Sequence, residues 1–173
     1  MASRKTTQSQ IRKGVIQMDT NLLQEVKAHW RQLRGMTYDL LDQLKGEDLD
    51  KKLPFPESQN IKYQFNCMIG AQESNIPLIT KGVWEGFSSS LDREKKVTVE
   101  IIKKHMQEAD RKLFAALDRT DLLMKFKDGS TPLMNYMILV EHESHHQGQL
   151  INFIYACNLP IPKSWADKWA LSK

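Results

Sequence analysis

Apolar residues recur with the period of an α-helix along four separate stretches of this chain. The first covers residues 19–45, where one helical face carries Leu22, Val26, Trp30, Leu33, Leu40 and Leu44. Comparable stripes over residues 58–79 and 98–117 predict a second and a third helix. This spacing is typical of helices that bury one face, and no stretch alternates residue by residue as a half-buried strand does. The pattern predicts an all-α protein.

The fourth stretch has the clearest start and end. Thr131 is a favourable N-cap residue, and Pro132 follows it at the first helical position. At the other end, Asn158 tolerates the left-handed conformation that closes many helices, and Pro160 prevents continuation. The stripe predicted to face inward consists of Leu133, Met137, Ile138, His142, His146, Gln149 and Phe153. Two histidines are thus expected on the buried face of this helix.

Four long amphipathic helices without strands favour a four-helix bundle, and the long connection over residues 82–96 leaves room for a crossover. Residues 18–173 are expected to form a single helical domain. Residues 1–17 carry four basic side chains and are predicted to be a basic, flexible N-terminal extension. The C-terminal tail contains Trp165, Trp169 and Leu171 and is expected to dock on the bundle.

Composition fits an ordinary globular protein and excludes some classes of partner. The 173 residues are 40% hydrophobic and 27% charged, with a formal net charge of +4. Acidic and basic residues are interspersed without an aromatic-interleaved basic stripe, so nucleic acid is not an expected partner. No apolar run approaches the roughly 18–20 residues that cross a bilayer, and no apolar signal segment follows the basic N-terminus. We therefore expect no membrane partner and a cytoplasmic location.

The strongest chemical feature is the pair His142 and His146. Residues four apart stack one turn apart on the same helical face, so two neutral imidazoles at this spacing can chelate one divalent ion. Burying two imidazoles costs free energy unless their polar atoms find partners, and a metal ion is one such partner. His145 lies about 100° away around the helix and is expected at the surface or in support of the site. Glu141 and Glu143 are expected to be surface residues, with the orientation of a metal ligand as the alternative role.

At these residues the chain resembles the DinB/YfiT-like superfamily, whose last bundle helix carries an H-x-x-x-H-[RQ]-G-Q element. Here that element reads from His142 to Gln149, as HESHHQGQ. The resemblance extends over about residues 20–171 and includes the segments 49–54, 69–73 and 159–165. It implies a four-helix bundle, frequently a homodimer, with a divalent metal held by three histidines. Some relatives are metal-dependent transferases that use low-molecular-weight thiols, and one is a maleylpyruvate isomerase.

The third histidine of the family falls on Met68 in this chain, which leaves the third ligand open. Met68 offers a soft thioether or simply packs in the core, and Gln72, one turn further, offers a carbonyl oxygen. Cys67 is an excellent ligand as a thiolate but lies about 100° from the stripe of its helix. His105 lies on the inward face of the third helix, as a ligand or as a core or interface histidine.

Two functions remain in competition at this point. The first is a divalent-metal-dependent enzyme for thiol transfer or hydrolysis, with a modified site for Zn, Ni, Mn or Fe. The second is a catalytically inactive DinB-like bundle whose metal is weak or absent, acting as a dimeric small-molecule-binding or interaction module. The expected partners are a second copy of the chain and a low-molecular-weight thiol or other small molecule. The sequence identifies no catalytic residue.

Overall fold

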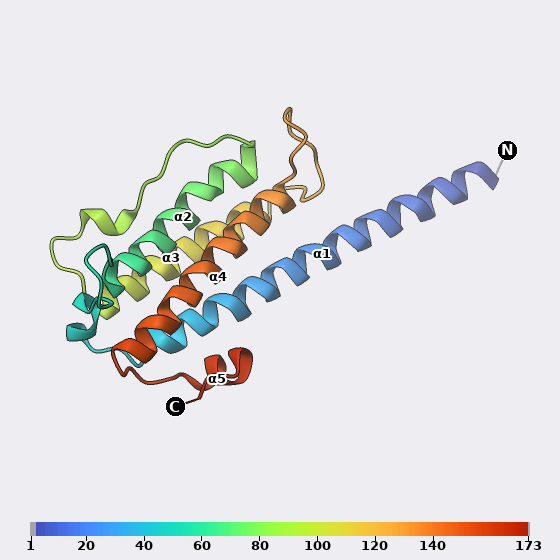
Figure 1. The fold of residues 1–173 in the computed structure, drawn as a ribbon. Helices are drawn as coiled ribbons and strands as arrows, with labels where there is room; N and C mark the ends of the chain where they lie inside the picture. Colours follow the sequence, from blue (N-terminus) through green and yellow to red (C-terminus); the bar gives the residue numbers. More distant parts are fainter. Residues whose placement is uncertain (1–2, 173) are drawn as a thin grey trace.

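The computed structural model describes residues 3–172 of the chain, and the side chains of residues 21–172. This part is helical, with an isolated bridge between Lys52 and Asn60 as its one β-type pairing. The elements are α1 (Ser3–Leu41), η1 (Gly46–Asp50), α2 (Ile61–Lys81), η2 (Ser90–Arg93), α3 (Val99–Leu117), α4 (Pro132–Ala156) and α5 (Lys163–Trp169) (Figure 1). The prediction of an all-α protein is confirmed.

The bounds of the first helix differ from those predicted. α1 begins at Ser3 rather than near residue 19, and it ends at Leu41, whereas Gly46 begins the short helix η1. After Leu41 the backbone tightens, because the amide of Leu44 donates to the carbonyl three residues earlier. The predicted basic extension covers residues 1–17, and the side chains of these residues lie outside the described part of the structure. The domain boundary at 17/18 therefore stays a prediction.

The predicted start and end of the fourth helix are confirmed. The Thr131 hydroxyl accepts a hydrogen bond from the amide of Met134, and Asn158 adopts a positive φ of 50°. Gly82 ends α2 with a φ of 67°, and a Cβ there would lie 2.5 Å from the ring of Phe126. Both the left-handed backbone and the close ring require glycine at this position.

Among the four long helices, α2 and α4 pack against each other most extensively (Figure 1). α2 contacts both α3 and α4, and α1 covers the other side of α3 and α4. The connection from α2 to α3 passes back along α2 through η2. In the tail, Trp165 is fully buried and its indole Nε1 donates to the carbonyl of Met36 at 2.6 Å, whereas Trp169 remains exposed. The predicted docking of the tail is therefore confirmed for Trp165.

The core consists of two apolar clusters along the helix axes. The first gathers the ends of the helices near η1 and α5, and the second gathers the opposite ends. The first cluster includes Leu40, Phe65, Met68, Met106, Leu150 and Trp165. The second cluster includes Val26, Trp30, Ile79, Leu113, Tyr136 and Leu139.

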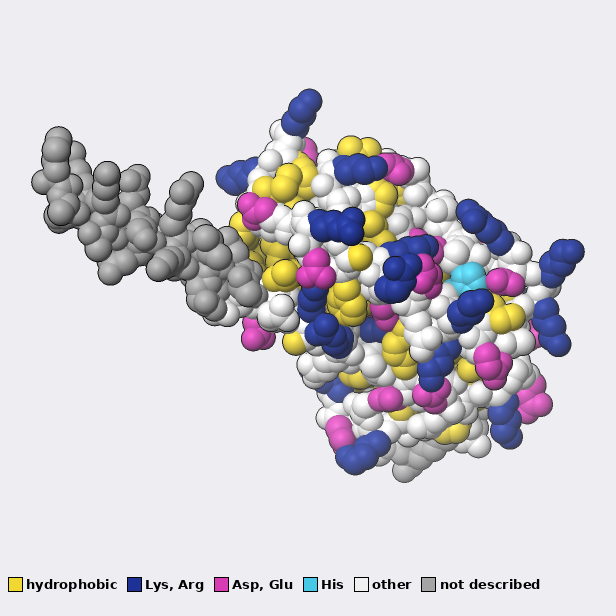
Figure 2. Space-filling view, turned by 180° about the vertical axis from the view of Figure 1, so that it is seen from behind, with side chains coloured by type: hydrophobic (Ala, Val, Ile, Leu, Met, Phe, Trp, Pro, Cys, Tyr) yellow, Lys and Arg dark blue, Asp and Glu magenta, His cyan; other side chains and the backbone are white. Residues whose placement is uncertain are grey.

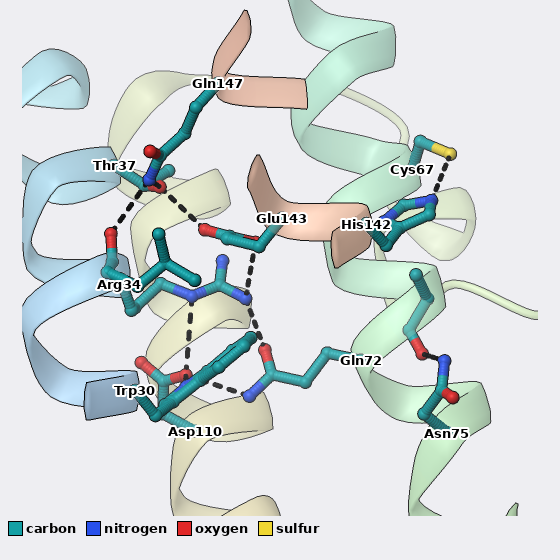
Figure 3. A network of polar contacts seen from close by, with 12 residues as sticks. Trp30, Arg34, Thr37, Cys67, Gln72, Asn75, Asp110, His142, Glu143 and Gln147 are labelled. Carbon is teal, nitrogen blue, oxygen red and sulfur yellow. Dashed lines mark hydrogen bonds and ion pairs between the residues drawn. The ribbon is translucent and has the colours of Figure 1, made fainter. Parts of the chain in front are cut away.

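A layer of polar side chains, all buried except the partly buried Asp110, lies between the two clusters, and we call it the polar layer. Figure 3 shows its contacts. Arg34 is 1% exposed, and it lies 3.2 Å from a carboxylate oxygen of Glu143 and 3.5 Å from one of Asp110. All four long helices contribute to this layer. Its members are Arg34, Thr37, Gln72, Asp110, Glu143 and Gln147.

The orientation of α4 corrects the predicted inward stripe. Met137 and Ile138 are about half exposed, and the buried face instead includes Asn135, Glu143 and Gln147. These polar side chains are buried because they have partners on other helices: Asn135 donates to the carbonyl of Leu78, and Gln147 donates to that of Leu33. Hydropathy alone selects the side of α4 that carries Met137 and Ile138. This side is rotated about the helix axis away from the face that is buried.

Candidate metal centre

Three potential metal ligands converge between α2 and α4. They are Cys67 on α2 and the two histidines predicted from the sequence, His142 and His146 on α4. One donor atom from each residue lies within 4.8 Å of the other two. His146 is buried, and the other two are half-buried. The structure thus brings Cys67, one of the four third-ligand candidates, to the histidine pair.

The distance between Cys67 and His142 fits either a hydrogen bond or a shared ion. The Cys67 Sγ atom lies 3.6 Å from His142 Nε2 (Figure 3). A tetrahedral Zn²⁺ with Zn–S of about 2.3 Å and Zn–N of about 2.0–2.1 Å holds its sulfur and nitrogen ligands about 3.6 Å apart. The separation observed therefore matches two ligands of one tetrahedral ion as well as it matches a hydrogen bond.

A hydrogen bond to Gln64 orients the second imidazole. His146 Nδ1 lies 2.7 Å from the side-chain oxygen of Gln64 on α2, and since an amide oxygen accepts, Nδ1 carries the proton. The lone pair is then on His146 Nε2, the nitrogen left for a ligand. Metal-binding histidines commonly donate their other N–H to an oxygen in this way, which fixes the tautomer and the ring orientation.

Burial sets the protonation of all three groups. Burial lowers the pKa of His146 from 6.5 to about 4, with a smaller contribution from His142. Burial also lowers the pKa of His142 and raises the pKa of the Cys67 thiol. At neutral pH the metal-free site therefore contains two neutral imidazoles and a protonated thiol. The imidazoles are ready to accept an ion, and the thiol must lose its proton to do so.

The other third-ligand candidates lie elsewhere in contacts of their own. Met68 is fully buried in the first apolar cluster. Gln72 belongs to the polar layer, where its oxygen accepts from Arg34 and its nitrogen donates to Asp110. His105 contacts the connection between α2 and α3: its Nδ1 lies 2.7 Å from the hydroxyl of Ser90, and its Nε2 lies 3.0 Å from Glu94.

The two glutamates expected at the surface lie in different environments. Glu141 is exposed, whereas Glu143 is 1% exposed, which corrects the prediction for that residue. Its carboxylate accepts a hydrogen bond from Thr37 and pairs with Arg34. Burial raises the pKa of Glu143, although the Arg34 guanidinium opposes this. Glu143 thus belongs to the polar layer and not to the candidate ligand set.

The candidate ligands form one wall of a pocket of about 910 Å³. His145, exposed as predicted, also lines this pocket, and its Nε2 accepts from the Gln149 amide at 2.9 Å. The lining also includes Leu53 and Phe55 from the segment that precedes α2, and the buried Phe153 of α4. A ligand in this pocket would therefore lie beside Cys67, His142 and His146.

Sequence reasoning missed Gln64, and it left Cys67 as one of four third-ligand candidates, away from the apolar stripe of its helix. Both residues lie on one face of α2, three positions apart, and this face points to α4 rather than into the first apolar cluster. The signal available in the sequence was that spacing, Gln64-x-x-Cys67, on a helix expected to pack beside the histidines. The apolar stripe of α2 hid it, because Met68 lies on the stripe and Cys67 does not.

Wider comparisons add no family to these observations. A scan against protein-family models finds no match for this chain, and a search of curated proteins finds no relative. Among the helices of the described residues, none is both long and apolar enough to cross a membrane. On the face shown in Figure 2, Lys and Arg side chains are interspersed with Asp and Glu.

Proposed function

We propose that this chain is a DinB-like four-helix bundle and a metal-dependent enzyme that catalyses thiol transfer or hydrolysis. The observation that carries this proposal is the convergence of Cys67, His142 and His146 on the wall of a pocket. Three protein donors that leave a further position for water or substrate are typical of catalytic rather than structural metal sites. The histidine pair on the last long helix agrees with the family resemblance.

The donor set favours Zn²⁺ among the four metals expected. A thiolate and two imidazoles suit a borderline-soft ion, whereas Mn²⁺ prefers carboxylate, carbonyl and water oxygens. Cys67 takes over the role that a histidine at position 68 has in the family, because its side chain, and not that of Met68, faces α4. The site is therefore modified in ligand type rather than reduced to two ligands.

A bound divalent ion would lower the pKa of a coordinated water or substrate thiol and so supply a nucleophile at neutral pH. The chain's own residues hold the ligands in position. Gln64 orients His146, and the contact with His142 places the Cys67 sulfur between the two helices. The pocket walls then position a substrate beside these donors.

Metal content tests the proposal directly. Elemental mass spectrometry on untagged protein should find close to one Zn²⁺ per chain, and Cys67→Ser and His142→Ala should each lose most of it. Matched controls are Cys157→Ser, the chain's other thiol, and His145→Ala, the neighbouring imidazole outside the ligand trio. Both controls should retain the metal. Loading with Co²⁺ should give a thiolate-to-metal charge-transfer band that disappears in Cys67→Ser.

If the protein takes up no ion, even with Zn²⁺ in excess, this result would contradict the proposed metal-dependent enzyme activity. That outcome would favour the alternative, an inactive DinB-like bundle that acts as a dimeric small-molecule-binding or interaction module. In that case the Cys67 thiol donates to His142 as a neutral hydrogen-bonded pair. The homodimer that the resemblance implies is tested separately by light scattering on the same samples.

A further inference from the structure

Among the three candidate metal ligands, Cys67 is the one whose donor atom can be oxidised. Its side chain is half-buried and lines the pocket together with His142 and His146, so a small molecule that enters the pocket reaches the sulfur. Figure 3 shows the thiol turned to His142, on the side of α4 away from the polar layer. A thiolate sulfur is oxidised stepwise, first to a sulfenic acid, whereas an imidazole nitrogen undergoes no such reaction.

The second cysteine of the chain is out of reach of Cys67. The Cys67 Sγ atom lies 3.6 Å from His142 Nε2, and Cys157 is the residue directly after α4, fifteen positions beyond His142. An α-helix rises about 1.5 Å per residue, so these two positions are about 22 Å apart. A disulfide needs Cα atoms within about 7 Å of each other. A disulfide at Cys67 therefore requires a thiol from another molecule, and the pocket has room for a small one.

Oxidation of Cys67 would leave a bound ion with two protein ligands. The thiolate is the form of cysteine that binds a metal, and neither a sulfenic acid nor a disulfide has its charge. The remaining donors are His142 and His146, whose ring centroids lie 4.5 Å apart. Metal affinity depends on the number of deprotonated ligands, so the site would release its ion on oxidation and take it up again on reduction.

We propose that Cys67 is a site of reversible oxidative modification, at which a mixed disulfide with a small thiol releases the metal ion. This inference deepens the proposed function by naming a regulation of the same site, and its metal-release step rests on that function. The modification itself needs only the accessible sulfur at the pocket.

The reaction balances with a peroxide as oxidant and a small thiol as co-reactant. The Cys67 sulfur attacks one peroxide oxygen, an S–O bond forms and the O–O bond breaks. Sulfur loses the two electrons that the peroxide gains, and the second oxygen leaves as hydroxide, which takes up a proton to become water. A small thiol then attacks the sulfenic sulfur, forms the S–S bond and releases a second water. Another small thiol reverses the modification, returning the Cys67 thiol and producing the disulfide of the small thiol.

The test uses Zn²⁺-loaded Cys157→Ser, in which Cys67 is the one remaining thiol. Hydrogen peroxide followed by free cysteine should add one cysteine per chain, and peptide mass spectrometry should locate it at residue 67. A chromogenic chelator should detect one released Zn²⁺ for each cysteine added. The modified protein should bind Zn²⁺ at least about 100-fold more weakly than the reduced protein. Reduction by excess thiol, desalting and renewed Zn²⁺ should restore the loaded state.

Two controls separate oxidation from other causes of metal loss. Cys67→His replaces the oxidisable ligand by an imidazole and should keep its Zn²⁺ through the same treatment. Cys157→Ser exposed to free cysteine without peroxide should also keep its Zn²⁺. The proposal is overturned if Cys67 stays unmodified under peroxide and thiol, or if Zn²⁺ stays bound while Cys67 carries the added cysteine. These two outcomes are read from Cys157→Ser alone, so they do not depend on metal binding by Cys67→His.

The two proposals fail separately. Chelator-treated Cys157→Ser should take the same modification, because the sulfur lines the pocket with or without an ion. Modified Cys67 in a protein that never binds Zn²⁺ would leave the modification site standing and remove the enzyme. Stoichiometric Zn²⁺ that survives the treatment beside an unmodified Cys67 would remove the regulation and leave the metal centre.

Discussion

His142 and Glu143 are consecutive residues of α4, yet their side chains enter two separate environments (Figure 3). The imidazole of His142 points to Cys67 on α2, and the carboxylate of Glu143 points to Arg34 on α1. Neighbours on a helix are about 100° apart around its axis, so one residue can face the pocket while the next faces the core. The candidate metal centre thereby lies on the pocket side of α4, and the polar layer lies on its core side.

Metal binding at neutral pH should release about one proton per ion. Burial lowers the pKa values of both histidines, which are therefore already neutral, and raises the pKa of Cys67, which must lose its proton. Zn²⁺ titrations by calorimetry in buffers of different ionisation enthalpy measure this number. The apparent affinity should also rise about tenfold per pH unit below the thiol pKa. Proton release that persists unchanged in Cys67→Ser would refute the assignment of the thiol as the proton source.

Removing the orienting hydrogen bond should weaken the metal site without removing a ligand. Gln64→Leu leaves His146 Nδ1 without its acceptor, so the ring loses its fixed tautomer and orientation. Substitution of such a partner typically costs 10–100-fold in metal affinity. The control Gln59→Leu changes an exposed amide of the same pocket and should keep the wild-type Kd for Zn²⁺. Equal affinities for Gln64→Leu and wild type would show that Gln64 plays no part in the site.

The polar layer should depend strongly on Arg34. Arg34→Met leaves the buried carboxylate of Glu143 and the partly buried one of Asp110 without their cation, which typically costs about 3–5 kcal/mol of unfolding free energy. The control Arg31→Met removes an exposed guanidinium that lies over the Phe114 ring, one turn earlier on α1, and should cost about 1 kcal/mol or less. Urea unfolding of both variants measures the difference. Equal losses would mean that the layer contributes no more than a surface contact.

The metal-free protein should lose stability as the pH falls from 6.5 to about 4. In this window the unfolded chain binds a proton at residue 146, whereas native His146, with its pKa lowered to about 4, does not. The full difference corresponds to about 3 kcal/mol. Urea unfolding of wild type and His146→Asn at both pH values isolates this contribution. The raised pKa of Glu143 changes the stability in the opposite direction to His146, and it does so equally in the two proteins. Parallel losses in the two proteins would contradict it.

The sequence alone determined the presence of the four long helices, the caps of the fourth and the histidine pair. These are local features: the 3.6-residue period, a hydroxyl at Thr131 before Pro132, and the spacing of His142 and His146 depend on neighbours a few residues away. The confirmed all-helical fold follows from such local information. The bundle family and the enzyme remain proposals, because the comparisons carry no family.

The tertiary structure decided which polar residues are buried and what they face. Glu143, Gln147 and Asn135 are buried with hydrogen-bond partners from α1 and α2, and hydropathy cannot distinguish such residues from exposed ones. The same holds for the third candidate ligand. Cys67 and Met68 differ by one position, and only the packing of α2 against α4 turns the thiol to the histidines and the thioether into the core. That rotation is set by contacts between segments about 75 residues apart.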